Sequence, residues 1–515
     1  MASMTDKVET LRINKETARC MGGPDKIAKQ HGQNKMTARE RLDLLFDPGT
    51  FYETGILAHS NHPAIGSRNT PADGVITGFG NIDGRLACAA AYDFTVLAGS
   101  MGEVGERKVS RLRAWALEKR VPMIWLVDSA GARIQESTGS QFAESGKLFF
   151  DQVTMSGVVP QVAAMMGPGA AGTAYIPALA DFVPMVKGTS SMALGGPHLV
   201  KAAIGEDISE QELGGSHIHC TKSGVADLEV DDDKECIKSI KRFLSYLPSN
   251  NLELPPVAAA DDPPDRVIEE LNSIIPDNPK LPFNMYDVIE NIVDRGSFFE
   301  IKSGWAKNLI TGFSRFNGNS CGIVASQPMV RGGILDIDSA DKATRFMQLC
   351  DAFNVPLIFL QDVPGFIIGS RVEKLGIIRH GAKMLFAVSE ATVPKITVVL
   401  RKAYGAGYYV MCGKHYEPDL IVAWPSAEIS VMGPEGAVNI IFRREIAESE
   451  NPEELRDERC AAFRQLISPY LAASNNYIDD IIEPSETRKV IIKGLALAKN
   501  KKIQRPWRKH GVMPV

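Results

Sequence analysis

Hydrophobic and polar positions follow the same order in the two halves of the chain. In the first half, an apolar segment at residues 86–92 precedes an amphipathic stretch with a basic face at 106–119 and a continuous apolar run at 123–127. The second half repeats this order at residues 321–326, 340–353 and 357–360. Short continuous apolar runs are typical of strands buried on both faces, and their alternation with helices favours α/β layers. The pattern therefore predicts an α/β fold that is built twice.

Residue identities support an internal duplication. The segment VPMIWLVDSAGARI (121–134) aligns with VPLIFLQDVPGFII (355–368), and half of the aligned positions are identical. The same constant offset pairs Lys108 with Lys342 and also pairs a tyrosine of the first half with Tyr409. An offset of nearly half the chain predicts two fused domains and not a solenoid of short repeats.

A proline-rich segment separates the two copies. Residues 248–282 hold eight of the 30 prolines, which is typical of a linker. The length of 515 residues also exceeds what one hydrophobic core organises, about 250–300 residues. We therefore assign residues 1–250 to a first domain, 251–283 to a Pro-rich linker and 284–515 to a second domain.

Composition and charge limit the partners that the chain can have and the compartment in which we expect it. Hydrophobic residues make up 44% and charged residues 23%, and the net charge is −5, so no basic excess points to nucleic acid. The uncharged stretch 152–180 is interrupted by prolines and glycines, so we expect no membrane insertion. The N-terminus carries charges where a signal peptide needs an apolar core, and the eight cysteines show no paired spacing. We expect a cytoplasmic protein, or one of an organelle matrix after processing.

The sequence lacks two signatures of metal and nucleotide chemistry. It contains no HExxH zinc motif and no complete P-loop, so we expect neither a bound metal nor bound ATP. His217 and His219 have a spacing that metal ligands could use, but we interpret them as polar turn residues. Asp128 and Asp362 end apolar runs, where a carboxylate caps a turn more often than it catalyses. The basic tail after Lys499 is interpreted as a solvated end.

Each half contains a turn of small residues after an apolar run, MMGPGAAGTAYIPA (165–178) and RKAYGAGYYVMCG (401–413). Small residues let the backbone approach a ligand, and successive N–H groups at a helix start can point at one developing negative charge. Such turns also serve merely to pack a helix tightly on a strand. Their occurrence at matched positions of a duplicated fold favours a pair of oxyanion holes.

Longer motifs carry a family resemblance. They are KMTARERLDLLFDPGTF (35–51), SAGARIQES (129–137), GPHLVKAAIGEDISEQELGGSHIHCTKSGVAD (196–227), QDVPGF (361–366), RKAYGAGYYVM (401–411), WPSAEISVMGPEGAV (424–438) and the terminal KHGVMP. With these motifs the whole chain resembles the carboxyltransferase (β) subunit of biotin-dependent acyl-CoA carboxylases, of the propionyl-CoA and methylcrotonyl-CoA type. The resemblance implies two tandem crotonase-like domains, the first on the acyl-CoA side and the second on the biotin side.

The resemblance also implies a reaction and its site. Carboxybiotin on a carrier of another polypeptide would give its carboxyl group to the enolate of a short or branched acyl-CoA. Ala171 and Gly172 match the family turn that holds the thioester, and Ala406 and Gly407 match the turn that holds biotin. Many relatives carry two glycines at the first turn and Gly-Ala at the second, but the backbone donors survive this difference.

Further residues and partners follow from the same resemblance. Gly131, Ala132 and Arg133 match the CoA-side loop, where Arg133 is either a phosphate or pantetheine neighbour or part of a structural ion pair. Tyr409 occupies a position that varies with the acyl group. The chain lacks a biotinylation motif, so the implied partner is an α subunit with biotin carboxylase and biotin carrier. A hexamer with active sites between protomers is also implied.

Three other functions remain open at this stage. A decarboxylase or transcarboxylase subunit would move a carboxyl group from a malonyl-type CoA to biotin through the same transition state. A stand-alone crotonase-like hydratase or hydrolase would need a pair of acid and base carboxylates near the first turn. A non-catalytic scaffold would need side chains that block the turns.

Overall fold

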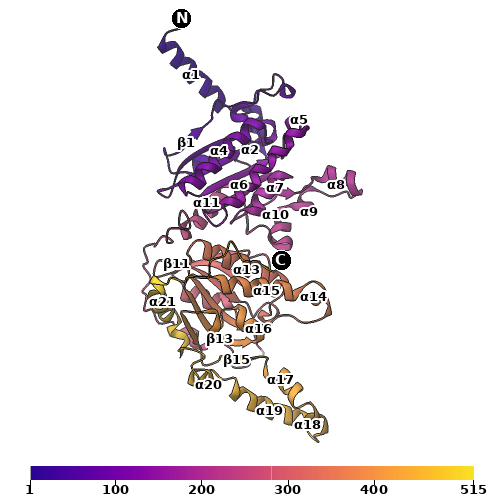
Figure 1. Cartoon of the computed structure of the whole chain (residues 1–515), viewed down its shortest axis with the longest axis vertical. Coiled ribbons are helices and arrows are strands. Elements are labelled where there is room, and N and C mark those ends of the chain that lie inside the picture. The colour runs from indigo at the N-terminus through magenta and orange to yellow at the C-terminus, as the bar shows by residue number, and fades with distance from the viewer. Residues whose placement is uncertain (1, 280) are drawn as a thin grey trace. The chain divides into compact units, whose positions relative to one another are not determined.

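The computed structural model describes residues 2–279 and 281–515, and Figure 1 shows its helices and strands. The chain divides into two compact units, Met1–Glu253 and Leu254–Val515. Each unit contains an eight-stranded sheet that is part antiparallel and part parallel. In the described part of the chain, no helix has the length and apolar character needed to cross a membrane.

The first unit arranges its strands in the order β1-β2-β3-β4-β5-β6-β8, with β7 paired to β5. The strands are β1 (Tyr52–Thr54), β2 (Val75–Ile82), β3 (Arg85–Tyr92), β4 (Met123–Ser129), β5 (Gln161–Ala170), β6 (Pro184–Val186), β7 (Ser191–Ala193) and β8 (Leu228–Val230). The helices are α1 (Met4–Arg19), α2 (Pro24–Gly32), α3 (Ala38–Leu45), α4 (Glu103–Lys119), α5 (Ile134–Ser137), α6 (Lys147–Met155), α7 (Gly172–Leu179), α8 (Pro197–Ile204), α9 (Glu210–Gly214), α10 (Ser216–Ile218) and α11 (Asp233–Tyr246). Strands β1 to β3 are antiparallel, and β3 to β8 continue in parallel.

The second unit has the same sheet in the order β16-β14-β13-β12-β11-β10-β9, with β15 paired to β13. Its strands are β9 (Phe299–Ile301), β10 (Leu309–Phe316), β11 (Asn319–Ser326), β12 (Leu357–Val363), β13 (Lys395–Tyr404), β14 (Leu420–Ala423), β15 (Glu428–Ser430) and β16 (Asp480–Ile481). Its helices are α12 (Met285–Ile292), α13 (Ile337–Ala352), α14 (Ser370–Lys374), α15 (Ile377–Glu390), α16 (Gly405–Val410), α17 (Pro434–Ile441), α18 (Arg443–Glu448), α19 (Pro452–Leu466), α20 (Pro469–Ser474) and α21 (Thr487–Leu497). Helices α17 to α19 extend away from this sheet (Figure 1).

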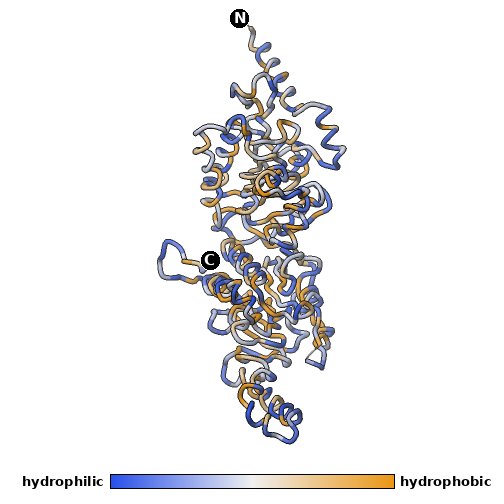
Figure 2. The backbone as a smooth tube through the Cα atoms, turned by 90° about the vertical axis from the view of Figure 1, so that its right-hand side faces the viewer, coloured by the Kyte–Doolittle hydropathy of each residue, from blue (hydrophilic) through white to orange (hydrophobic). Residues whose placement is uncertain are grey.

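The elements expected from the hydrophobic pattern are present in both copies. The apolar segment, amphipathic stretch and apolar run of the first half form β3, α4 and β4, and those of the second half form β11, α13 and β12. The parallel strands β4 and β12 are buried along their whole length, as continuous apolar runs require. Figure 2 shows hydrophobic and hydrophilic residues interleaved along the backbone of both units. The predicted α/β duplication is confirmed.

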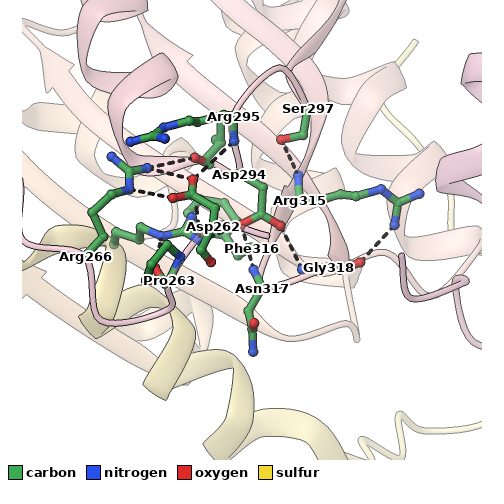
Figure 3. Close-up of polar contacts among 12 residues, drawn as sticks. Asp262, Pro263, Arg266, Asp294, Arg295, Ser297, Arg315, Phe316, Asn317 and Gly318 are labelled. Carbon is green, nitrogen blue, oxygen red and sulfur yellow. Dashed lines mark hydrogen bonds and ion pairs between the residues drawn. The ribbon is translucent and has the colours of Figure 1, made fainter. Parts of the chain in front are cut away.

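The structure extends the duplication further upstream than the sequence alignment does. Asp47 follows α3 and accepts hydrogen bonds from the N–H groups of Asp83 (3.1 Å) and Gly84 (2.8 Å) in the β2–β3 turn. Asp294 follows α12 and accepts bonds from the turn residues Asn317 (2.9 Å) and Gly318 (2.7 Å), as Figure 3 shows. An aspartate after a helix therefore holds the first hairpin in each copy, although the two aspartates do not align at the offset of the main repeat.

The Pro-rich segment packs on the second unit. Asp262 forms a bidentate ion pair with Arg266, at 2.8 and 3.0 Å (Figure 3). Arg266 also donates to the carbonyl oxygen of Asn291 in helix α12, at 2.9 Å. Ile268, Leu271 and Phe283 belong to the hydrophobic core of this unit. The division between the units lies at the start of this segment, and its remainder is part of the second body.

Candidate active site

The first small-residue turn joins strand β5 to helix α7. Ala171 stands between them at φ 51° and ψ −116°, a conformation that residues with a side chain rarely adopt. Its N–H donates a 3.1 Å hydrogen bond to the carbonyl oxygen of Ala193 in β7. The N–H of Ala170 donates to Thr173 Oγ1 at 2.8 Å. Helix α7 then begins at Gly172, and the first amides of a helix have no acceptor within it.

The second turn joins strand β13 to helix α16 in the equivalent way. Gly405 aligns with Ala171 in the repeat and also has a positive φ, 55°, which a glycine adopts without the strain that an alanine bears. Ala406 and Gly407 follow as the second and third residues of α16. Their N–H groups also precede the first possible intrahelical hydrogen bond.

The geometry corrects one predicted donor. The sequence indicates Ala171 and Gly172 as a pair, but strand β7 already accepts the N–H of Ala171. Across residues 2–279 and 281–515, no acceptor faces the N–H of Gly172, Ala406 or Gly407. Ala171 therefore shapes the first turn, and Gly172 is its available donor.

A glycine that follows the central strand packs against each turn. Gly131, at φ 94°, lies so close to the first turn that a Cβ atom there would be 2.8 Å from the Ala170 carbonyl oxygen. In the second copy, a Cβ atom on Gly407 would lie 3.1 Å from Cα of Gly365. The structure thus brings Gly131 of the predicted CoA-side loop to the first turn. Ala132 is exposed beside it and forms a β-bridge with Met101.

Arg133 is buried and takes no part in the exposed surface of this loop. Its NH1 atom donates to Asp73 Oδ1 at 2.6 Å and to Glu136 Oε1 at 2.9 Å. Its NH2 atom donates to the Ser100 carbonyl oxygen at 3.0 Å, and Nε donates to Ser100 Oγ at 3.3 Å. The side chain is 2% exposed. Of the two roles expected for Arg133, the structure shows the contacts of a structural ion pair.

Asp128 is committed to a buried ionic network at the end of β4. Its carboxylate is fully buried and accepts hydrogen bonds from Lys35 Nζ (2.7 Å), Arg41 NH1 (2.9 Å) and Gln30 Nε2 (2.9 Å). Arg41 also binds Asp233 through Nε at 2.8 Å. A buried carboxylate with this many hydrogen-bond donors around it holds its neighbours in place. This is the structural role that the sequence favours over a catalytic one.

Asp362 has the same role in the second copy with a different partner. Arg401 donates to it from Nε (3.2 Å) and NH2 (2.8 Å), and the N–H of Lys402 adds a third bond at 3.0 Å. The residue that aligns with Arg401 in the first copy is Gly167, where a Cβ atom would overlap Asp128 Oδ1 at 1.8 Å. The first copy therefore supplies its cations from the N-terminal segment, and the second supplies one from its own strand.

Tyr409 lies in an aromatic group that lines a cavity of the second unit. Its ring centroid is 5.9 Å from that of Tyr408 and 6.2 Å from that of Tyr416, and half of the residue is exposed. The cavity has a volume of about 490 Å³ and is also lined by Ser389, His415, Glu417 and Arg505. Tyr409 and Ala406 are both in α16, so this aromatic wall is one helical turn from the second oxyanion turn.

Two buried lysines support the start of the same sheet in each copy. Lys108 donates from Nζ to the carbonyl oxygens of Ala72 (2.8 Å) and Val75 (2.6 Å). Lys342 donates to the carbonyl oxygens of Lys302 (3.0 Å), Trp305 (2.9 Å), Ala306 (3.4 Å) and Leu309 (2.7 Å). Burial lowers the pKa of Lys108 to about 8 and that of Lys342 to about 7. The internal alignment shows a lysine at this position in both copies, but it did not predict that the two lysines bind backbone carbonyl groups.

The two histidines of the GGSHIHC segment are bonded to neighbouring residues. His219 contacts the Met192 carbonyl oxygen through Nε2 and Ser223 Oγ through Nδ1, both at 2.8 Å. Burial lowers the pKa of His219. Thr221 lies 3.5 Å from Nε2 of His217. The described residues contain no group of three or more His, Cys, Asp or Glu side chains placed to hold a metal ion.

Comparison with known proteins connects this geometry to one family. The model of the carboxyl transferase domain matches residues 29–513. The carboxyltransferase subunit of propionyl-CoA carboxylase from Haloferax mediterranei is 47% identical over 517 residues, which cover 100% of both chains. The methylmalonyl-CoA decarboxylase subunit alpha of Veillonella parvula is 44% identical over 518 residues, again with 100% of both chains covered.

A solved structure has the same fold over the full chain. It is the 12S subunit of transcarboxylase, described as a hexamer assembly with methylmalonyl-coenzyme A and methylmalonic acid bound. The TM-score is 0.96 and the sequence identity 45%, with 100% of this chain and 99% of that chain covered. The two-sheet duplication is therefore the crotonase-like tandem fold that the sequence motifs imply.

Proposed function

This chain belongs to the carboxyl transferase family, and from that premise we propose that it carboxylates a short or branched acyl-CoA at its α or vinylogous carbon. It is a carboxyltransferase subunit of the biotin-dependent acyl-CoA carboxylase and decarboxylase group. The first unit would hold the acyl-CoA and the second unit the biotin.

One observation carries this proposal: the two small-residue turns occupy equivalent places in the duplicated sheet and present unpaired amides. Loss of an α-proton turns a thioester carbonyl into an enolate, whose oxygen needs hydrogen-bond donors. The Gly172 N–H supports this role in the first unit. The N–H groups of Ala406 and Gly407 would stabilise charge on the ureido oxygen in the second unit. Each such donor is worth about 2.7–4 kcal/mol of transition-state stabilisation in other enzymes.

The ionisable side chains next to the first turn are not placed for acid and base catalysis. Asp128 accepts three buried hydrogen bonds, and Arg133 is enclosed by Asp73, Glu136 and Ser100. A hydratase needs a pair of available carboxylates at this position, so the geometry does not favour that reaction. Carboxybiotin, when delivered by a partner, supplies both the carboxyl group and a nitrogen that can accept the substrate proton. The chain then has to orient the two substrates and stabilise charge.

Co-purification tests the direction of the reaction and the partners. We expect a hexamer of this chain to bring down a biotinylated protein, detected with avidin, together with biotin carboxylase, identified by mass spectrometry. ATP, bicarbonate and acyl-CoA should then yield a carboxylated CoA ester. Recovery of a membrane decarboxylase partner in place of biotin carboxylase would instead support a decarboxylating function, which is the function that the name of the Veillonella relative gives. ATP-dependent carboxylation by this chain alone would contradict the proposal.

A further inference from the structure

The C-terminal tail lies against the helix that borders the Tyr409 cavity. Residues 501–515 form neither a helix nor a strand, yet three of their basic side chains have acidic partners. Lys501 Nζ is 2.7 Å from Asp419 Oδ2, and Arg508 pairs with Glu390 at the end of α15. The tail therefore contacts the second unit through these three side chains, although Arg505 and Arg508 also remain exposed to solvent.

Arg505 makes the connection between this tail and the cavity. Its NH1 and NH2 atoms donate to the two carboxylate oxygens of Glu417 at 3.0 and 2.7 Å. NH2 also donates to the Ser389 carbonyl oxygen at 3.1 Å, which fixes the guanidinium between α15 and the loop after α16. The hydrogen bond and charge of Arg505 lower the pKa of Glu417, so both groups are charged at neutral pH. A bidentate pair of this kind restrains direction as well as distance.

The ion pair with Arg505 restrains Glu417, a residue whose backbone conformation is unfavourable. It adopts the left-handed conformation at φ 57°, which is unfavourable for a residue with a side chain and needs support from its surroundings. Tyr416 directly precedes it and faces Tyr409 across 6.2 Å between ring centroids, with 33° between the ring planes. Tyr409 itself is half exposed, so its neighbours Tyr408 and Tyr416 decide where its ring lies.

We propose that Arg505 is a positioning residue that sets the Tyr416–Tyr409 wall of the cavity and, through it, the preference of the enzyme among acyl-CoA substrates. This inference rests on the proposed function and on the family resemblance, in which Tyr409 of the second unit occupies a position that varies with the acyl group. The C-terminal tail then acts on selectivity without contacting the substrate, because Glu417 and Tyr416 transmit its position to Tyr409.

The same contacts predict that Arg505 adds little to global stability. The side chains of Arg505 and Glu417 are 36% and 50% exposed, and ion pairs at such positions contribute little to the free energy of unfolding. Loss of the pair should therefore leave a folded, assembled protein with a displaced loop. The aromatic wall lies one helical turn from the second oxyanion turn, so a small displacement of the wall changes the geometry of the bound groups. Reaction rates are sensitive to such small displacements.

The test compares the ratio of kcat/KM values for propionyl-CoA and butyryl-CoA, measured with the assembled enzyme and its biotin-bearing partner. We expect Arg505→Gln and Glu417→Gln to change this ratio in the same direction by about threefold or more, and Arg505→Lys to restore most of it. Arg508→Gln is the matched control, since it removes a tail ion pair that does not involve Glu417. It should leave the ratio unchanged.

Two results separate this inference from the proposed function. If Tyr409→Ala shifts the ratio and both Glu417→Gln and Arg505→Gln leave it unchanged, the positioning role of Arg505 is wrong and the Tyr409 site stands. If Tyr409→Ala also leaves the ratio unchanged, the placement of the acyl group beside Tyr409 is wrong, and the inference falls with it. Thermal melting and the oligomer mass of each variant confirm that selectivity is compared between folded enzymes.

Discussion

Replacement of Gly407 by alanine tests the second oxyanion turn most directly. A Cβ atom at this position would lie 2.8 Å from Cγ2 of Val363 and 3.1 Å from Cα of Gly365. Carbon atoms pack favourably at about 3.5–4.0 Å, so the turn or the end of β12 has to move by several tenths of an ångström. Val363 is fully buried and β-branched, and its side chain has few alternative rotamers. The added methyl group therefore displaces the amides of α16.

Two magnitudes follow from this crowding. Overpacking a tight site costs about 1–3 kcal/mol of stability, which lowers the melting temperature by about 2–4 °C for each kcal/mol in a unit of this size. Displacement of hydrogen-bond donors in an active site typically costs more, about 100-fold in rate. We therefore expect Gly407→Ala to fold, to melt a few degrees lower and to lose about 100-fold in kcat/KM.

Gly172→Ala is the matched control at the first turn. Its Cβ atom would lie 3.5 Å from Met101 Cε and 3.7 Å from Phe149 Cζ, which are ordinary contacts. The backbone N–H survives the substitution, so this variant should keep most of the wild-type kcat/KM. Adding Val363→Ala to Gly407→Ala should recover part of the activity, because two of the crowding atoms are removed. Equal losses in both single variants, or full activity of Gly407→Ala, would refute the steric argument.

Three further outcomes can be measured. Ala171→Gly should raise the free energy of unfolding by about 1 kcal/mol in urea, since relief of backbone strain exceeds the entropy cost of glycine, and a decrease would contradict the strained conformation. Asp362→Ala should destabilise the protein by about 3–5 kcal/mol, because the guanidinium of Arg401 is left buried without its partner; a loss below about 1 kcal/mol would speak against the buried pair. Burial lowers the pKa of His219 from 6.5, so the unfolded chain binds its proton more readily and the free energy of unfolding falls as the pH drops below 6.5. His219→Gln should make that fall shallower in denaturation curves between about pH 7 and 5, and an unchanged slope would count against this assignment.

The sequence alone predicted most of the architecture because its signals are local. The apolar runs that became β4 and β12 need only their own composition to be recognised as buried strands. The internal alignment indicated the second copy, and the small residues indicated both turns. The upstream part of the duplication stayed hidden because the spacing between Asp47 and Asp294 differs from the main offset, so the two residues do not align.

The active-site residues were predicted less completely, because availability depends on distant neighbours. The Ala171 N–H looks like a donor until Ala193, further along the chain, returns in β7 to accept it. The motif around Arg133 left two roles open for this residue, and only the structure shows that Asp73 and Ser100 enclose it. A family motif identifies which residues matter and leaves open which of their atoms remain unpaired.

Sequence by itself therefore determined the repeated α/β order, the place of the two turns and the family, since periodicity and short motifs are written in consecutive residues. Tertiary structure decided which amides remain unpaired, which charges are buried, and that Arg505 reaches Glu417 across 88 positions of the chain. These properties depend on long-range hydrogen bonds and packing, and they exist only once the sheet has brought separated segments together.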